Sequence, residues 1–361
     1  MKYEIKTKKL PKSEVEIEVS LPADLLNSAR QKAINLFSSS LEIDGFRKGH
    51  VPEKVVIEKV GDDRLLDEAA DILLKEHFPK IIVQENFDII GQPKISITKL
   101  ALENPVEFKA IFAVMPVFEL PDYREIASNI NAKPASAEAT ASEKEVDEVL
   151  LQIRKNKAHM DWSHSAKATR DEHNNLVHDH PDFDKEENLP PLDDVLAQAA
   201  GSFKNLAELK EKIKENIISE KKYRNAEKKR AAIMDELVKK TKIELPEILV
   251  TSETEKSLAQ MKDEIERMGG NFANYLTNAK KSEDDLKKDL RESSEKKAKI
   301  QLVFNKIAVA ENLEPNKEIL ENEVKEIMQH YPGASETNAR VYVSTILMNQ
   351  EVLKLLESQN G

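Results

Sequence analysis

The stretch from Gly45 to Pro52, Gly-Phe-Arg-Lys-Gly-His-Val-Pro, places an aromatic side chain and two cations between two glycines. The glycines permit positive φ and a tight turn, and the proline fixes φ and can open a following helix. This spacing predicts a loop tip that presents Phe46, Arg47 and Lys48 away from the body. Arginine suits carboxylate and phosphate partners, and together with an aromatic residue it forms a common interface anchor. Because surface loops are normally polar and glycine-punctuated, an ordinary surface turn is the alternative.

The chain contains no residue pattern that predicts catalysis. It has no cysteine, which excludes a thiolate nucleophile, a thiolate metal site and a disulfide. Its sequence also has no Gly-rich phosphate loop, no Gly-x-Ser-x-Gly and no His-Glu-x-x-His. We therefore expect no catalytic residues, no cofactor and no enzymatic activity.

Residues 163–189 hold four of the eight histidines, many acidic residues and a single aromatic residue, Phe183. The histidines of this segment are His164, His173, His178 and His180. Three of them, with Asp179 and Asp182, could supply nitrogen and oxygen ligands to a metal ion. Their spacing fits no compact zinc pattern, and a segment without periodicity does not preorganise a site. We expect a solvated linker here and no metal, with metal binding as the alternative.

Composition limits the class of protein. The chain has 361 residues, of which 34% are charged and 5% aromatic, so we expect two or three domains with long solvated helices. A net charge of -11 argues against a general nucleic-acid binder, which needs a basic surface. The N-terminus lacks the apolar core of a signal peptide, and no apolar run approaches the ~20 residues of a membrane span. These features predict a soluble, cytoplasmic protein that does not contact a membrane.

Hydrophobic periodicity divides the chain. Residues 1–116 mix alternating segments with helical apolar stripes, which predicts an α+β domain. The expected strands cover 14–19, 89–90, 95–97 and 106–114, with Pro93 between the second and third. Residues 117–133 have the pattern of an extended connector, and Ser142 with Glu145 is a candidate capping box that opens a helix. Residues 190–361 are helical throughout and share wide Lys/Glu faces, which predicts an open, arm-bearing helical assembly.

At this point the sequence resembles trigger factor, the ribosome-associated bacterial chaperone. The Gly45–Pro52 stretch is similar to the family's ribosome-docking signature, and Phe118–Tyr123 resembles its connector. Three further segments resemble features of the family's helical domain; they are Ile243–Glu247, Ser282–Leu286 and Ile307–Leu313. The resemblance covers nearly the whole chain outside residues 163–189.

The resemblance implies an ATP-independent chaperone that docks beside the ribosomal exit tunnel and holds nascent or unfolded polypeptides. The ribosome-binding residues carried over by position are Gly45, Phe46, Arg47, Lys48, Gly49 and Pro52. The implied partners are a tunnel-exit ribosomal protein, with nearby rRNA as a further candidate, nascent chains, and a second copy off the ribosome. The domains would be a ribosome-binding domain at 1–116, a connector and helix at 117–162, and a helical chaperone domain at 190–361. The residues that contact clients are not identified by the sequence.

One departure from the family pattern concerns residues 163–189. The family inserts a prolyl isomerase domain of the FKBP type at this place. A stretch of 27 residues is well below the ~50 of even a small domain, so it cannot form the sheet and pocket of an isomerase. We expect the isomerase domain to be missing. The alternatives are a complete prolyl isomerase of the trigger factor type and a holdase that does not bind ribosomes.

Overall fold

The computed structural model of the protein describes residues 3–40, 46–47, 49–133, 140–165, 169–170, 176–177 and 182–359. The chain forms two compact units. One unit comprises Met1–Pro121 and Leu237–Val352, and the other comprises Asp122–Glu236 and Leu353–Gly361. Both units are therefore built from segments that lie far apart in the sequence.

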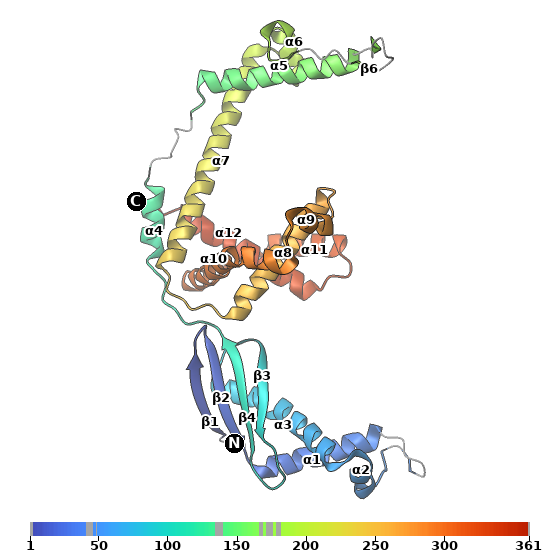
Figure 1. The fold of residues 1–361 in the computed structure, drawn as a ribbon. Coiled ribbons are helices and arrows are strands. Elements are labelled where there is room, and N and C mark those ends of the chain that lie inside the picture. The colour runs from blue at the N-terminus through green and yellow to red at the C-terminus, as the bar shows by residue number, and fades with distance from the viewer. Residues whose placement is uncertain are drawn as a thin grey trace. The chain divides into compact units, whose positions relative to one another are not determined.

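The first unit contains an antiparallel four-stranded sheet in the order β1-β2-β4-β3 (Figure 1). Its strands are β1 (Glu4–Leu10), β2 (Glu14–Leu21), β3 (Ile89–Lys99) and β4 (Val106–Val114). The alternation expected for 14–19 and 106–114 is confirmed, because Ile17 and Val19 are buried and pair with Ala110 and Phe108. The sequence analysis missed β1, whose side chains are mostly exposed and polar.

Strand β3 corrects the expectation of two short strands. It runs without interruption from Ile89 to Lys99. Its pairing with β4 shifts register between Ile90 and Lys94, and Gly91 within this bulge has a φ of +74°. Pro93 is tolerated there because β3 lies at the edge of the sheet, where a residue without an N–H does not break a ladder.

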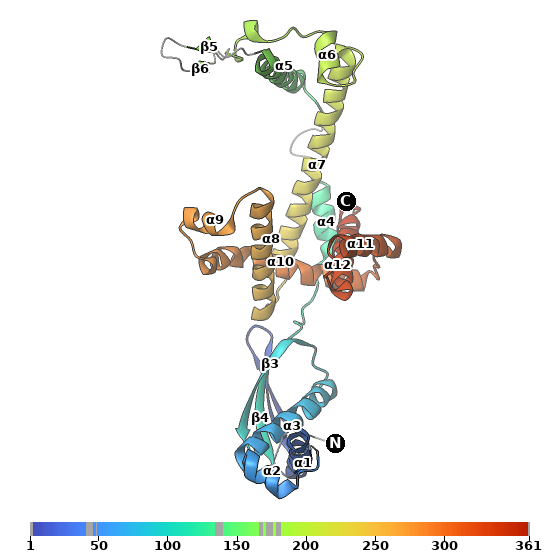
Figure 2. The same ribbon diagram turned by 90° about the vertical axis from the view of Figure 1, so that its right-hand side faces the viewer.

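Three helices cover one face of this sheet (Figure 2). They are α1 (Ala23–Ser40), α2 (Glu53–Val60) and α3 (Asp62–Gln84). Phe78 of α3 packs edge-on against Phe108 and Phe112 of β4, with ring centroids 6.5 and 6.2 Å apart. The α+β expectation for the N-terminal region is thus confirmed.

The remainder of the first unit is helical. Its helices are α8 (Glu247–Arg267), α9 (Phe272–Ala279), α10 (Glu283–Ala310), α11 (Lys317–His330) and α12 (Glu336–Glu357), whose last turn belongs to the second unit. Ser282 and Asp285 form the capping box of α10, with each side chain bonded to the other residue's backbone N–H. Helices α11 and α12 pack through Val324, Ala339 and Val343.

The second unit is built on two long helices, α5 (Glu143–Ser165) and α7 (Leu206–Lys240). The last four residues of α7, from Leu237 on, belong to the first unit. Two shorter helices, α4 (Tyr123–Asn131) and α6 (Asp194–Ala200), the 3₁₀ turn η1 (Glu186–Asn188) and the two-residue strands β5 (Thr169–Arg170) and β6 (Leu176–Val177) complete it. Helix α4 corrects the expectation of an extended connector. The Asp122 side chain caps this helix by accepting from the Glu125 N–H at 2.9 Å, and Ile126 and Ala127 are buried.

The segment 163–189 also differs from a wholly solvated linker. Helix α5 extends to Ser165, and Phe183 and Leu189 are 8% and 9% exposed. They form a small cluster with Ala158 and Trp162 on the last turns of α5. Phe183 and Leu189 therefore hold residues 182–189 against the helix, together with the ion pairs Lys155–Asp184 and Arg154–Glu186.

Asn131 joins three distant parts of the second unit. Its side-chain Nδ2 donates to the backbone carbonyl oxygens of Leu356 and Gln359, both at 2.9 Å. Its backbone carbonyl oxygen accepts from Lys229 Nζ at 2.7 Å. Arg230 is ion-paired with Glu357 beside this amide. The Asn131 amide thereby satisfies carbonyl groups that the end of α12 leaves without an intrahelical partner.

We expect Asn131→Ala to lower the free energy of unfolding of this unit by about 1–2 kcal/mol, because it leaves part-buried carbonyl groups without a donor. Urea unfolding followed by Trp162 fluorescence measures the change, since Trp162 is the chain's only tryptophan. Asn131→Asp keeps the size of the side chain but removes both amide hydrogens, so it should be at least as destabilising. A wild-type midpoint for Asn131→Asp would contradict this role.

Candidate docking loop and apolar surfaces

The loop that begins after α1 is fixed at its base. The N–H of Gly49 donates to the carbonyl oxygen of Ser38 at 2.9 Å, and Ser38 Oγ donates to the carbonyl oxygen of Val51 at 3.3 Å. Ser38 and Val51 are each 7% exposed, so the loop is attached to the core at this point. Pro52 follows with φ of -59° and opens α2, as its position in the sequence predicted.

The tip of the loop is a tight turn. The N–H of His50 donates to the carbonyl oxygen of Arg47 at 2.9 Å, and Gly49 has φ of +82°. Positive φ carries little cost for glycine, which explains the glycine at this position. Phe46 is 42% exposed and Arg47 is also exposed. Four of the six candidate residues thus lie on one loop, whereas Gly45 and Lys48 lie outside the described residues.

Large apolar side chains are exposed on the helices of both units. The most exposed examples, on the helices or at their C-caps, are Val83, Met160, Val195, Tyr223, Met268, Val309, Tyr331, Val341 and Tyr342, each at least 59% exposed. Methionine is an adaptable apolar side chain, but in the C-terminal half of the chain Met268 is exposed whereas Met234, Met261, Met328 and Met348 are half-buried. Valine and tyrosine contribute more of this surface than methionine, and composition alone gave no sign of that.

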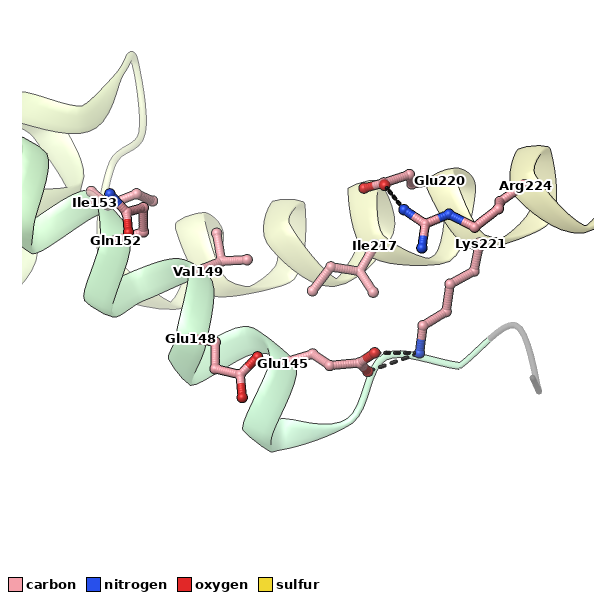
Figure 3. A pocket seen from close by; sticks show the side chains of 9 residues that line it. All are labelled: Glu145, Glu148, Val149, Gln152, Ile153, Ile217, Glu220, Lys221 and Arg224. Carbon is pink, nitrogen blue, oxygen red and sulfur yellow. Dashed lines mark hydrogen bonds and ion pairs between the residues drawn. The ribbon is translucent and has the colours of Figure 1, made fainter. Parts of the chain in front are cut away.

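Helices α5, α6 and α7 enclose two adjoining hollows in the second unit. One, of about 440 Å³, lies between α5 and α7 and is drawn in Figure 3. Val149 of α5 and Ile217 of α7 point into it, and Ile153 lies at its far end. The other hollow, of about 410 Å³, continues along α5 as far as Met160 and is lined on its other sides by α6, by Phe203 and by the first turns of α7. Val149 and Ile153 line both hollows, so the two form one furrow along α5.

An ion pair closes one end of the furrow. Lys221 Nζ lies 2.6 Å from a carboxylate oxygen of Glu145 (Figure 3). It also donates to the carbonyl oxygen of Thr140 at 2.7 Å. Glu145 accepts from the N–H and the hydroxyl of Ser142, both at 2.9 Å, which confirms the capping box expected from the sequence. The ammonium of Lys221, assisted by the two bonds from Ser142, lowers the pKa of Glu145 to about 2. This carboxylate thereby links the start of α5 to the middle of α7.

Acid should weaken this link. Because the pKa of Glu145 is lower in the folded chain than its ordinary value of 4.5, its contribution to stability is complete above about pH 4.5 and is lost as the pH falls toward 2. We expect Glu145→Gln, which keeps the cap but removes the charge, to flatten the pH dependence of the unfolding midpoint in that window. Trp162 fluorescence at several pH values measures it. Glu148→Gln, on the same wall of the hollow, is the matched control and should retain the wild-type slope.

The structure offers no support for a metal centre in the part of the chain that it describes. Among those residues, no three His, Cys, Asp or Glu side chains are grouped so that they could hold a metal ion. His173, His178, His180 and Asp179 lie outside the described residues, and the side chain of His164 is not described either. No helix in the described ranges has both the length and the apolar character to cross a membrane.

Two family models match the chain. The model described as bacterial trigger factor protein matches residues 2–153, and the model of the trigger factor C-terminus matches residues 205–356. Residues 154–204 lie outside both matches. Together the two models cover well over half of the chain, in the order found in the family.

Individual relatives agree with these models. The trigger factor of Carboxydothermus hydrogenoformans is 24% identical over 395 aligned positions that cover 92% of each chain. The trigger factor of Finegoldia magna is 25% identical over 372 positions, covering 86% of this chain and 84% of the relative. A solved structure described as "Promiscuous Substrate Recognition in Folding and Assembly Activities of the Trigger Factor Chaperone" is similar in fold, with a TM-score of 0.57 at 19% identity over 98% of this chain and 99% of that one.

A loop that exposes Phe46 and Arg47 beside the four-stranded sheet domain, together with helices that expose apolar side chains, has the features expected of a polypeptide-binding protein of the chaperone class. The two family models, which match residues 2–153 and 205–356, identify the particular family. The chain belongs to the bacterial trigger factor family. It is a ribosome-associated chaperone that binds nascent polypeptides.

Proposed function

We propose that the loop from Gly45 to Pro52 is the contact with the ribosome, at a protein beside the tunnel exit. The observation that supports this most is the exposure of Phe46 and Arg47 on a loop whose base is tied to the core through Ser38. Because the loop base is fixed, docking requires less ordering of the chain than a free loop would. Arg47 and Lys48 would pair with acidic groups of the partner, and Phe46 would bury its ring in an apolar recess.

We further infer that this chain works without isomerase catalysis. Residues 154–204, which neither family model matches, contain the second half of α5, the two-residue strands β5 and β6, η1 and α6 in the part that is described. Strands β5 and β6 pair with each other over two residues each, whereas an isomerase pocket of the expected type needs a larger twisted sheet. Residues 1–116 would then dock, while 117–162 and 190–361 hold the client, in the cytoplasm, without ATP and with a homodimer as the form off the ribosome.

Sedimentation with ribosomes tests the docking proposal directly. The intact protein should pellet with empty ribosomes and more strongly with ribosomes that carry a nascent chain. A protein that suppresses aggregation of an unfolded client but never pellets with ribosomes would be a holdase of the non-ribosomal kind, and docking would be refuted. A prolyl-peptide isomerisation assay on the same preparation should show the uncatalysed rate. Turnover at the level of an isolated FKBP domain would overturn the non-catalytic proposal.

A further inference from the structure

The two edges of the four-stranded sheet differ in how open they are to a further strand. Strand β3 forms one edge, which contains Pro93 and shifts its register after Ile90 and again after Ile97. A proline and a bulge are two of the devices that prevent an edge from pairing with another chain. Strand β1 forms the other edge (Figure 1) and pairs with β2 in one unbroken register from Glu4 to Leu10. Of the two edges, β1 is therefore the regular one.

The backbone of β1 has hydrogen-bonding groups on its outer side. Among the strands in the described ranges, β2 alone pairs with β1. Because the N–H and C=O groups of successive residues in a strand point alternately to either side, about half of those in β1 point away from the sheet. The start of the strand is held in place, since the Tyr3 hydroxyl lies 2.9 Å from Nδ1 of His77 and Ile5 packs against the core. A fixed edge lowers the cost of ordering when a further strand is added.

Three lysines determine the charge of this edge. Lys6, Lys8 and Lys9 are exposed, and within the part of the chain that the structure describes none of them forms an ion pair. By contrast, Lys109 of β4 pairs with two glutamates of β2, at 3.3 and 3.1 Å. The chain as a whole has a net charge of -11, so three unpaired lysines on one strand are a local exception. Complementary charge at such a surface selects a negatively charged partner.

The positions of the side chains on β1 define the pattern that a partner needs. Lys6 and Lys8 lie on the face of the sheet that the helices do not cover, whereas Ile5 and Thr7 lie on the covered face, opposite buried residues of β2. A strand that pairs with β1 would place alternate side chains opposite the two lysines and the remaining ones beside Ile5 and Thr7. The matching segment therefore has acidic residues at alternate positions, with apolar residues between them.

A second copy of this chain fits the edge less well than an acidic segment does. If two β1 strands pair antiparallel about Thr7, Lys6 of each copy lies opposite Lys8 of the other. Like charges directly opposite each other destabilise a pair of strands. The sheet edge therefore disfavours pairing with itself.

A nucleic acid also fits the edge less well. It would lie across the uncovered face, where Glu16 and Glu18 of β2 stand opposite Lys8 and Lys6 and repel phosphate groups. A peptide that lies in the plane of the sheet places its carboxylates one strand beyond the lysines. At about 4.8 Å between strands, they are about 10 Å from the glutamates, a distance at which exposed charges are largely screened.

We propose that β1 binds an extended acidic segment of a partner protein, which joins the sheet as a fifth strand. Its main chain would bond to the outward N–H and C=O groups of β1, and two of its carboxylates would pair with Lys6 and Lys8. The acidic side chains distinguish this partner from an unfolded client, which is held through exposed apolar surface. The proposal goes beyond docking through the Gly45–Pro52 loop and beyond client holding, and it depends on neither.

A fluorescent heptapeptide with glutamate and valine at alternate positions is the probe, and its anisotropy with the full-length protein at about 0.1 M salt measures binding. We expect Lys6→Glu combined with Lys8→Glu to weaken binding at least fivefold, because two cross-strand pairs of opposite charge become pairs of like charge. The same variant should bind a heptapeptide with lysine in place of glutamate at least fivefold more tightly than the wild type does. Lys54→Glu with Lys59→Glu, both exposed on α2, makes the same change in net charge and is the matched control. It should change the affinity less than twofold.

Hydrogen–deuterium exchange separates the addition of a strand from simple ion pairing. Exchange in β1 should slow when the glutamate peptide binds, since the outward N–H groups gain partners. Binding without slower exchange, or equal affinity of the wild type and the Lys6→Glu/Lys8→Glu variant, would overturn the proposal. So would the absence of binding with a Kd below about 1 mM, and the lysines would then serve to keep other strands from the edge. A single-stranded RNA that displaces the peptide from the wild type and binds more tightly would assign the edge to phosphate groups and also overturn the proposal.

Discussion

A variant in which Phe46, Arg47 and Lys48 are all replaced by alanine should bind ribosomes at least about a hundredfold more weakly than the wild type. Truncation of a central aromatic or arginine anchor typically costs 2 kcal/mol or more, and 1.4 kcal/mol corresponds to a tenfold change in affinity. The variant should fold normally, because Phe46 and Arg47 are exposed and the hydrogen bonds that fix the loop base come from Ser38 and Gly49. Co-sedimentation at graded ribosome concentrations measures the loss.

The same α/β layer offers a matched control for this variant. Lys75, Lys80 and Val83 on α3 are exposed, with Val83 at 80%, so their joint replacement by alanine removes the same charge and one apolar side chain. This control should bind ribosomes within about twofold of the wild type. Wild-type binding by both triple variants would refute docking through the loop. Equal loss in both would mean that net positive charge, and not the anchor loop, carries the interaction.

The loop also illustrates what the sequence can reveal about a site. Glycine, aromatic and cationic types at fixed spacing were sufficient to predict an exposed tip, because those residue types have strong local conformational preferences. The sequence did not indicate Ser38 as the residue that holds the loop base. A serine within a helix has no local signature for this role, since the partner carbonyl lies thirteen residues further along the chain. Only the folded arrangement brings the two together.

The strands and helices differ in the same way, because some have a clear local sequence pattern and others depend on contacts with distant residues. Strands β2 and β4 were predictable because burial on one face imposes strict alternation, whereas β1 lies at an edge with mostly exposed side chains and carries little pattern. Helix α4 was mistaken for a connector because it is only nine residues long and follows a proline-rich stretch. Its stability comes from the cap at Asp122 and from burial of Ile126, neither of which a short periodic window reveals.

The furrow was beyond the reach of the sequence for a related reason. Val146, Val149, Leu150 and Ile153 have the sequence spacing of a single apolar stripe on a helix. In the structure Val146 and Leu150 are each 1% exposed, while Val149 is 37% exposed. Which part of a stripe stays open depends on where α6 and α7 pack, and both lie more than forty residues away in the sequence. A stripe predicts burial on a face but not how much of that face is covered.

A second substitution with a large expected effect lies in the core between the four-stranded sheet and helices α1, α2 and α3. Phe108 is 1% exposed, lies opposite Val19 and Ile97 on the flanking strands, and contacts Phe78 of α3. We expect Phe108→Ala to lower the free energy of unfolding of this layer by about 3–5 kcal/mol, since it combines lost burial with a cavity between sheet and helix. Native domains have only about 5–15 kcal/mol in total, so the layer should open frequently. Hydrogen–deuterium exchange of β2 and β4 peptides would report that opening.

The single tryptophan supplies an internal control, because Trp162 belongs to the other unit and packs with Ala158, Phe183 and Leu189. Its fluorescence transition in urea should stay at the wild-type midpoint in Phe108→Ala, while exchange in β2 and β4 rises by at least a hundredfold. Glu107→Ala, an exposed neighbour on the same strand, should change neither measurement. A Trp162 transition that moves together with the strands would show that the two units unfold as one. In that event, Phe108→Ala would remove client holding, because the second unit would unfold with the sheet. It would also remove docking, because the loop base at Ser38 and Val51 depends on the same core that Phe108 fills.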